Sequence, residues 1–213
     1  MTDNTPRPQR GRHFSMLRGF HLADWFTLAN ALCGTWAVFS AMRFLQYGDP
    51  VDLMLGMSLI PLAFVFDALD GRIARWRKVA STLGRELDSL SDVISFGVAP
   101  AAIGYACGMQ GGWDWLVLGY FVACGVSRLA RYNVTAELLA GDEGKVKYFE
   151  GTPIPTSMFI VLGLAVLAWQ GRLGDALWLG EWQVGPATLH PLSLVYALSG
   201  TLMISRTLRI PKP

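Results

Sequence analysis

Charged residues are scarce in this sequence. Asp, Glu, Lys and Arg make up 16% of its 213 residues, against about 25% in an ordinary soluble domain. The 18 basic and 16 acidic residues leave a net charge of only +2, so no basic surface for nucleic acid is indicated and no nucleic-acid partner is expected. Apolar residues reach 52%, which excludes disorder over most of the chain because so much apolar surface would not stay solvated.

Cysteine and histidine are also few, with three of each. Cys33, Cys107 and Cys124 lie far apart inside apolar stretches. They have neither the CxxC spacing of a zinc site nor the even number of a disulfide framework. We therefore expect three buried, free cysteines that behave as small hydrophobic residues. The histidines are scattered, so no Ser–His or Cys–His nucleophile is indicated.

Long apolar runs are abundant. A helix of about 20 apolar residues crosses a bilayer, and six stretches approach that length. The first exceeds the apolar core of a cleaved signal peptide and is expected to be a true span. The fourth is short unless it extends through Leu129. The sequence thus predicts an all-α membrane protein with six transmembrane helices, at Trp25–Met42, Val51–Leu69, Val93–Met109, Trp113–Val126, Ile154–Trp169 and Leu189–Ser205.

The distribution of Lys and Arg predicts the orientation of these spans. Sixteen of the 18 lie in the two terminal segments and in the loops after spans two and four, and two lie in the other connections. By the positive-inside rule, both termini and those two loops face the cytoplasm, which implies an inner (cytoplasmic) membrane protein. Residues 1–13 are polar and contain prolines. We expect them to form a mobile tail ahead of a single domain, 14–213.

Four aspartates interrupt the apolar pattern where the second span leads to the third. Asp67 and Asp70 are three residues apart and Asp88 and Asp92 are four apart, so each pair shares a helical face. Two helices joined by a short cytoplasmic turn would bring the four carboxylates into one polar cavity that faces the cytoplasm. Such a cluster is costly unless a cation neutralises it. Oxygen ligands favour Mg²⁺ or Mn²⁺, and four carboxylates suit two such ions, as in phosphoryl chemistry.

The basic residues around the aspartates leave more than one explanation open. These cations suit a pyrophosphate, but they would equally pair with the aspartates at the membrane surface; they are Arg72, Arg75, Arg77, Lys78 and Arg85. A cation transporter would also use carboxylates as a transit site. Transport sites usually lie near the middle of the membrane, however, whereas these carboxylates gather at one end of their spans.

A known family has the same spacing of residues. The signature of the CDP-alcohol phosphotransferases resembles Asp67-x2-Asp70-Gly71-x2-Ala74-Arg75-x8-Gly84-x3-Asp88-x3-Asp92. The resemblance implies six transmembrane helices around a cytoplasm-facing cavity, and commonly a homodimer. It implies that the divalent metal pair is held by Asp67, Asp70, Asp88 and Asp92, with Asp92 acting chiefly as general base. It implies contacts to the CDP moiety from Gly71, Arg75, Gly84 and, in the first span, Thr27 and Asn30. Hydrogen bonding between helices is the other explanation for Thr27 and Asn30.

Three further segments resemble the phosphatidylserine synthases of that family: Ser127–Val134, Phe149–Pro155 and Met203–Arg206. This likeness implies transfer of the phosphatidyl group from CDP-diacylglycerol, within membrane lipids, to L-serine, with phosphatidylserine and CMP as products. An acceptor carboxylate or a lipid phosphate would suit the basic residues Arg128, Arg131, Lys145 and Lys147, which could instead set the topology under anionic headgroups. Glycerol 3-phosphate, inositol phosphate or choline as acceptor also remains open.

Overall fold

The structure is a computed structural model that describes residues 21–77, 82–140, 148–205 and 209–211. Most of these residues are helical. Two long helices, α1 (Leu22–Tyr47) and α2 (Pro50–Arg77), come first. The third rod runs without a break through α3 (Thr82–Asp92), the π-helical turn η2 (Val93–Val98) and α4 (Ala99–Ala106). The later helices are α5 (Gly112–Ala140), α6 (Ser157–Trp169) and α7 (Leu194–Ile204), with short 3₁₀ turns η3 (Ile154–Thr156), η4 (Gly174–Ala176) and η5 (Pro191–Ser193).

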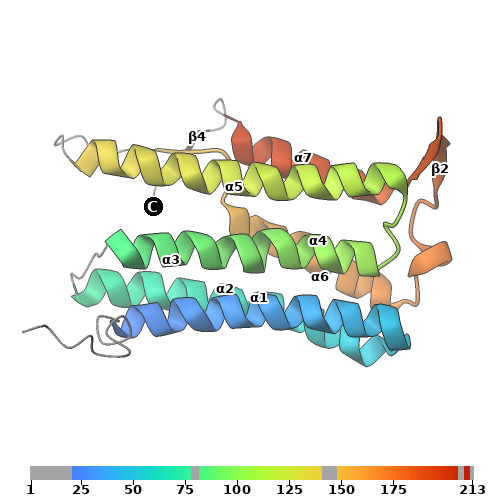
Figure 1. The fold of residues 1–213 in the computed structure, drawn as a ribbon, viewed down its shortest axis with the longest axis horizontal. Helices are drawn as coiled ribbons and strands as arrows, with labels where there is room; N and C mark the ends of the chain where they lie inside the picture. The colour runs from blue at the N-terminus through green and yellow to red at the C-terminus, as the bar shows by residue number, and fades with distance from the viewer. Residues whose placement is uncertain (1–20, 78–81, 141–147, 206–208, 212–213) are drawn as a thin grey trace, which may run out of the picture.

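Two small sheets accompany the helices. β1 (Tyr148–Glu150) pairs antiparallel with β4 (Arg209–Pro211), and β2 (Trp182–Val184) pairs antiparallel with β3 (Ala187–Leu189). The first sheet joins the segment before α6 to a segment after α7. The second is a hairpin at the opposite end of the molecule from the end of α2 and the start of α3 (Figure 1).

Each of the six apolar stretches lies mainly on a helix, although Leu189 belongs to β3 and α4 ends at Ala106. By length and composition, three helices in the described part of the chain can cross a membrane: Leu22–Tyr47, Pro50–Ile73 and Thr82–Ala106. Two shorter apolar helices follow, Ile154–Trp169 and Pro191–Ile204. A mostly helical chain with candidate membrane-spanning helices is thus confirmed, while the count of six spans stays a prediction. The third helix begins at Thr82 rather than Val93, and the fourth continues well past Leu129.

The helices lie side by side along the long axis of the molecule (Figure 1). α1 packs along α2, and α5 packs along α7, with the α3–α4 rod between these pairs. The start of α1, the end of α2, the start of α3 and the end of α5 all lie at the same end of the bundle. Polar residues from four helices therefore meet there.

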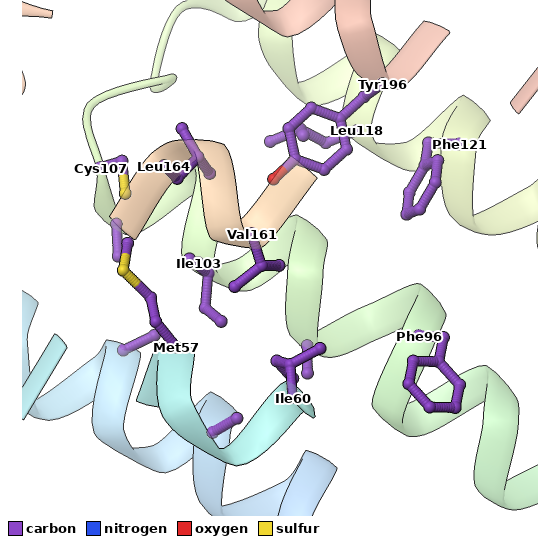
Figure 2. Packing of buried hydrophobic residues seen from close by; sticks show 14 of the residues in the cluster. Met57, Ile60, Phe96, Ile103, Cys107, Leu118, Phe121, Val161, Leu164 and Tyr196 are labelled. Atoms are coloured by element: carbon purple, nitrogen blue, oxygen red, sulfur yellow. The ribbon is translucent and has the colours of Figure 1, made fainter. Parts of the chain in front are cut away.

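Apolar packing and a few buried hydrogen bonds hold the middle of the bundle. Figure 2 shows Tyr196 of α7 beside Phe121 of α5; the two rings meet edge to face with centroids 5.2 Å apart. The Tyr196 hydroxyl donates to the carbonyl of Pro100 at 2.7 Å. The three cysteines are buried and free, as expected from the sequence.

The backbone hydrogen bonding of the third rod changes near its proline, although the helix continues. Pro100 has no N–H, so the carbonyl of Phe96, four residues earlier, receives no helical hydrogen bond from it. The hydroxyl of Ser157, at the start of α6, donates to that carbonyl instead, at 2.7 Å. The π-helical turn Val93–Val98 directly follows Asp92. Single π-helical turns of this kind are frequent at functional sites.

Candidate active site

The four aspartates of the signature lie together at one end of the bundle. Asp67 and Asp70 belong to the last part of α2, and Asp88 and Asp92 to α3. Carboxylate oxygens of Asp67, Asp70 and Asp88 all come within 4.8 Å of one another. Asp92 lies one helical turn beyond Asp88 and lines the same cavity. The short connection between α2 and α3 makes this approach possible, as the sequence spacing predicts.

A cavity of about 350 Å³ opens in front of this cluster, a size within the usual range for a small-molecule site. Its wall on α3 is formed by Arg85, Asp88, Ser89 and Asp92. These positions follow the i, i+3, i+4, i+7 spacing of one helical face. The rest of the wall comes from α2, α5 and the segment before α6, with the residues Asp67, Ala68, Asp70, Gly71, Arg75, Arg128, Leu129, Tyr132, Asn133, Pro153 and Pro155.

The charges of the cavity fit a bound cation. Four carboxylates and three guanidiniums line it. Asp70 and Asp92 are almost fully buried, with 5% and 7% of their surface exposed. One buried carboxylate oxygen, Oδ1 of Asp88, has no hydrogen-bond partner among the described residues. A buried acceptor without a donor is costly, and a hard divalent cation is the ligand that such oxygens suit.

Helix α1 lies behind two of the carboxylates. The hydroxyl of Thr27 donates to Oδ2 of Asp70 at 2.8 Å, and the side-chain amide of Asn30 donates to Oδ1 of Asp92 at 3.2 Å. Both side chains are buried, and neither is among the residues that line the cavity. The interhelical hydrogen bonding considered for these residues from the sequence is therefore present.

Of the two arginines predicted on α5, Arg128 lines the cavity and Arg131 does not. Arg128 lines it together with Leu129, Tyr132 and Asn133. These four residues cover one arc of α5, since successive residues of an α-helix turn by roughly 100°. Arg131 falls on the other side of Arg128, outside that arc, and does not line the cavity. Nε of Arg128 is buried without a hydrogen-bond partner in the described chain, and Arg128 interacts electrostatically with Asp92.

The remaining predicted residues divide into two groups. Gly71 and Arg75 line the cavity on α2, and a Cβ at Gly71 would come 3.7 Å from an Arg75 guanidinium nitrogen. Gly84 lies on α3 beside the cavity-facing side rather than on it. Lys145, Lys147 and the predicted tail 1–13 lie outside the described residues.

Three polar residues of the cavity wall are absent from the site residues predicted: Ser89, Tyr132 and Asn133. Asn133 is buried, and its amide donates to the hydroxyl of Ser89 at 3.0 Å and to the carboxylate of Glu86 at 3.3 Å. This network joins α5 to α3 beside the aspartates. Helical spacing offered the signal, because Asn133 lies four residues after Leu129 and five after Arg128 on a helix that was expected to end earlier.

The cavity rim at Pro153 and Pro155 is fixed by a glycine. Gly151 has a positive φ of 74°, which favours glycine, and a Cβ there would overlap the carbonyl of Met203 in α7. The next amide, of Thr152, donates to the carbonyl of Leu202 at 3.2 Å. The end of α7 therefore holds the rim segment in place.

Comparison with known proteins shows the family of this chain. Residues 20–196 match the family model described as CDP-alcohol phosphatidyltransferase. The chain therefore belongs to the CDP-alcohol phosphatidyltransferase family and is an integral membrane protein. Its acidic cluster corresponds to the divalent-metal use that is general in that family.

Several relatives carry the name CDP-diacylglycerol–serine O-phosphatidyltransferase. A protein of Saccharomyces cerevisiae is 45% identical over 204 residues, which cover 94% of this chain and 74% of the yeast protein. A protein of Methanocaldococcus jannaschii is 34% identical over 72% of this chain and 65% of its own length. A protein of Mycobacterium bovis is 37% identical over 59% of this chain, but the match spans only 44% of the mycobacterial protein.

Proposed function

We propose that this protein transfers the phosphatidyl group of CDP-diacylglycerol to the hydroxyl of L-serine, giving phosphatidylserine and CMP. The observation that carries the proposal is the meeting of three carboxylates within 4.8 Å in a cavity that also contains Arg128. Relatives with this activity in their names match most of the chain, among them the yeast protein at 45% identity. The family signature itself leaves the acceptor alcohol open, so the choice of serine depends on those relatives and on Arg128.

The aspartates are the proposed metal ligands. Asp67, Asp70 and Asp88 would hold a divalent cation, Mg²⁺ or Mn²⁺, and the addition of Asp92 gives ligands enough for two ions. When bound, the cations neutralise charge on the diphosphate and on the departing CMP. The open oxygen of Asp88 supports this assignment, because a carboxylate saturated by protein donors would have no lone pair available.

The CDP moiety is proposed to lie along α2. Gly71 leaves room for a bulky group beside the helix, and the exposed Arg75 next to it supplies a guanidinium for the diphosphate. Guanidinium groups bind phosphate oxygens strongly and with defined geometry. Gly84 belongs to the same proposed set through the family signature, and Thr27 and Asn30 are considered separately below.

Arg128 is the proposed ligand of the serine carboxylate. It faces the cavity from α5 and interacts electrostatically with Asp92, so an acceptor held by Arg128 lies near the general base. Arg131, Lys145 and Lys147 are proposed to bind lipid phosphates at the surface. Of these four basic residues, only Arg128 would contact the acceptor alcohol and so affect which acceptor is used.

The chemistry proposed is a direct displacement. Asp92 accepts the proton of the serine hydroxyl, and the hydroxyl oxygen forms a bond to the phosphorus next to diacylglycerol. The bond from that phosphorus to the bridging oxygen breaks, and CMP departs with the electron pair. No covalent enzyme intermediate forms. Replacement of Asp92 by Asn is expected to lower kcat by about 10²- to 10⁴-fold, the usual contribution of a general base; normal turnover in that variant would exclude the assignment.

The proposed arrangement in the membrane follows the charge distribution. Six helices cross the inner membrane, with the termini and the cavity on the cytoplasmic side, where 16 of the 18 Lys and Arg residues fall. The predicted domain, residues 14–213, would form a homodimer. Light scattering of the detergent-solubilised protein tests the dimer, and labelling of single cysteines placed in the loops tests the orientation.

The activity is tested by following CMP release from CDP-diacylglycerol by the purified protein. Serine, glycerol 3-phosphate, inositol, inositol phosphate and choline are supplied in turn, each with Mg²⁺, with Mn²⁺ or with a chelator. Release that requires both serine and a divalent cation is expected. Release with another acceptor would keep the site and reassign Arg128. No release with any acceptor from folded protein, together with metal flux in vesicles, would support the cation transporter instead.

A further inference from the structure

Two buried residues of α1 bind the carboxylates of the site from behind. Thr27 and Asn30, one helical turn apart, are 3% and 0% exposed. Thr27 donates to Asp70 at 2.8 Å and Asn30 donates to Asp92 at 3.2 Å. The acceptor atoms are Oδ2 of Asp70 and Oδ1 of Asp92, so each hydrogen bond occupies one oxygen of its carboxylate. Neither donor lines the cavity, so both act on the cavity through the aspartates.

The backbone of α1 is itself fixed against the helix that carries Asp92. The hydroxyl of Ser95, in the π-helical turn after Asp92, donates to the carbonyl of Asn30 at 2.8 Å. One turn later, a Cβ at Gly34 would come only 2.6 Å from Cα of Ser95. Only glycine permits this approach of the two helices. The backbone carbonyl and the side-chain amide of Asn30 therefore both bind the same segment, which contains Asp92 and Ser95. These contacts restrict the orientation of the Asn30 side chain toward Asp92.

The kind of donor matters for a cation site. An Arg or Lys in place of these residues would also bind a carboxylate, but it would bring a positive charge that competes with the cation. Hydroxyl and amide donors orient a carboxylate without neutralising it. The buried face of α1 presents no basic side chain, since its buried polar residues are Asp24, Thr27, Asn30 and Ser40. The cluster thus keeps its negative charge while two of its members lose rotational freedom.

We propose that Thr27 and Asn30 are positioning residues of the catalytic site. Thr27 orients Asp70 and thereby sets the affinity for the divalent cation. Asn30 orients Asp92 and thereby sets the rate of turnover. The inference rests on the proposed function, which supplies the metal site and the general base. A positioning role can be distinguished from direct contact of Thr27 or Asn30 with the nucleotide, because the two roles predict different results.

The test for Thr27 uses Mn²⁺ binding, measured by electron paramagnetic resonance on the purified protein without substrate. Thr27→Val removes the hydroxyl at nearly constant volume, and we expect it to weaken Mn²⁺ binding about tenfold or more, as loss of a hydrogen bond to a charged group does. Thr27→Ser keeps the hydroxyl and is expected to bind like the unaltered protein. Thr35→Val is the matched control, because the Thr35 hydroxyl donates to the carbonyl of Ala31 in its own helix.

Unchanged Mn²⁺ binding in Thr27→Val, with a raised KM for CDP-diacylglycerol, would overturn the positioning role and favour the nucleotide contact. Thr27→Ala serves the same comparison if the valine variant does not yield monodisperse protein. The binding measurement needs no turnover. It therefore remains readable even if the unaltered protein releases no CMP with serine, the result that would refute the proposed function itself.

The test for Asn30 separates kcat from KM. Asn30→Leu removes the amide at similar size, and we expect kcat to fall about tenfold or more while KM for CDP-diacylglycerol stays within about twofold. Its thermal unfolding, compared with that of Thr35→Val, checks that the helix packing survives. A raised KM with unchanged kcat would overturn the assignment, since it would mean that Asn30 binds substrate rather than positions Asp92.

Discussion

An aspartate lies at each end of the bundle, and the two differ in their surroundings: Asp114 is fully buried, whereas Asp88 is half-buried. Asp114, at the start of α5 near the β2–β3 hairpin, has no exposed surface. It accepts hydrogen bonds from the amides of Gly111 and His190, both at 2.9 Å, and its Oδ2 lies 2.6 Å from the His190 ring. Asp88, at the other end, keeps an oxygen with no partner among the described residues.

This difference separates a structural carboxylate from a functional one. Both carboxylate oxygens of Asp114 have protein partners, and these contacts join α5 to the segment after the hairpin. The cluster at Asp88 instead concentrates like charges and provides too few donors for them. Such an arrangement is unfavourable by itself, and it becomes favourable when a cation binds. The two aspartates thus differ both in exposure and in the supply of hydrogen-bond donors.

The strongest way to test this contrast is to remove one charge from the acidic cluster. Asp88→Asn is expected to lower serine-dependent CMP release at least about 100-fold, because even partners of metal ligands contribute 10- to 100-fold. Mn²⁺ binding should weaken in parallel. The apparent Tm of the apoprotein in detergent should stay the same or rise, since one of the repelling charges is gone. A fall in Tm with intact Mn²⁺ binding would mean that Asp88 is structural.

The matching change at the other end is Asp114→Asn. The new amide nitrogen would face a donor that Asp114 now satisfies, and an unsatisfied buried donor costs about 1–3 kcal/mol. We therefore expect a lower apparent Tm, measured by thermal unfolding in detergent. The kcat of the fraction that remains folded should equal that of the unaltered protein. A selective loss of kcat at normal Tm would contradict the contrast between the two ends.

A smaller effect on kinetics is expected from substitutions of Arg128 and Arg131, which lie on the same helix, α5, but differ in whether they line the cavity. Arg128→Lys keeps the charge but loses the planar guanidinium, so we expect KM for serine to rise roughly tenfold, about 1.4 kcal/mol. Arg131→Lys, outside the cavity, should change KM for serine less than twofold. Steady-state kinetics with varied serine and saturating CDP-diacylglycerol measures both. Equal effects of the two changes would show that Arg128 does not bind the acceptor.

Much of this arrangement was predictable from sequence because it depends on local spacing. The pairs Asp67/Asp70 and Asp88/Asp92 each lie on one helical face. Because the connection between α2 and α3 is short, the two pairs are brought close together. Apolar runs located the helices. Their ends were less predictable: α3 begins at Thr82, eleven residues before the apolar run, because its early turns face the cavity rather than lipid and so are polar.

Contacts between distant segments were beyond prediction. Asn133 binds Ser89, which is 44 residues away in sequence. The hydrophobic periodicity of α3 or of α5 does not indicate which faces of the two helices pack together. The positions of Thr27 and Asn30 behind the carboxylates, rather than in the cavity wall, likewise depend on the packing of α1. The spacing of Arg128 and Arg131 suggested a shared role, but only Arg128 lies on the arc of α5 that lines the cavity.

The pairing of β1 with β4 has a consequence for the order in which the site is completed. The four aspartates lie in the first half of the chain, whereas the rim at Pro153 and Pro155 is secured by Leu202 and Met203, and its preceding strand pairs with residues 209–211. During synthesis the acidic cluster is therefore made well before the segments that complete the wall of its cavity. The chain becomes a competent catalyst only after its late segments have been made and have folded back onto the rim.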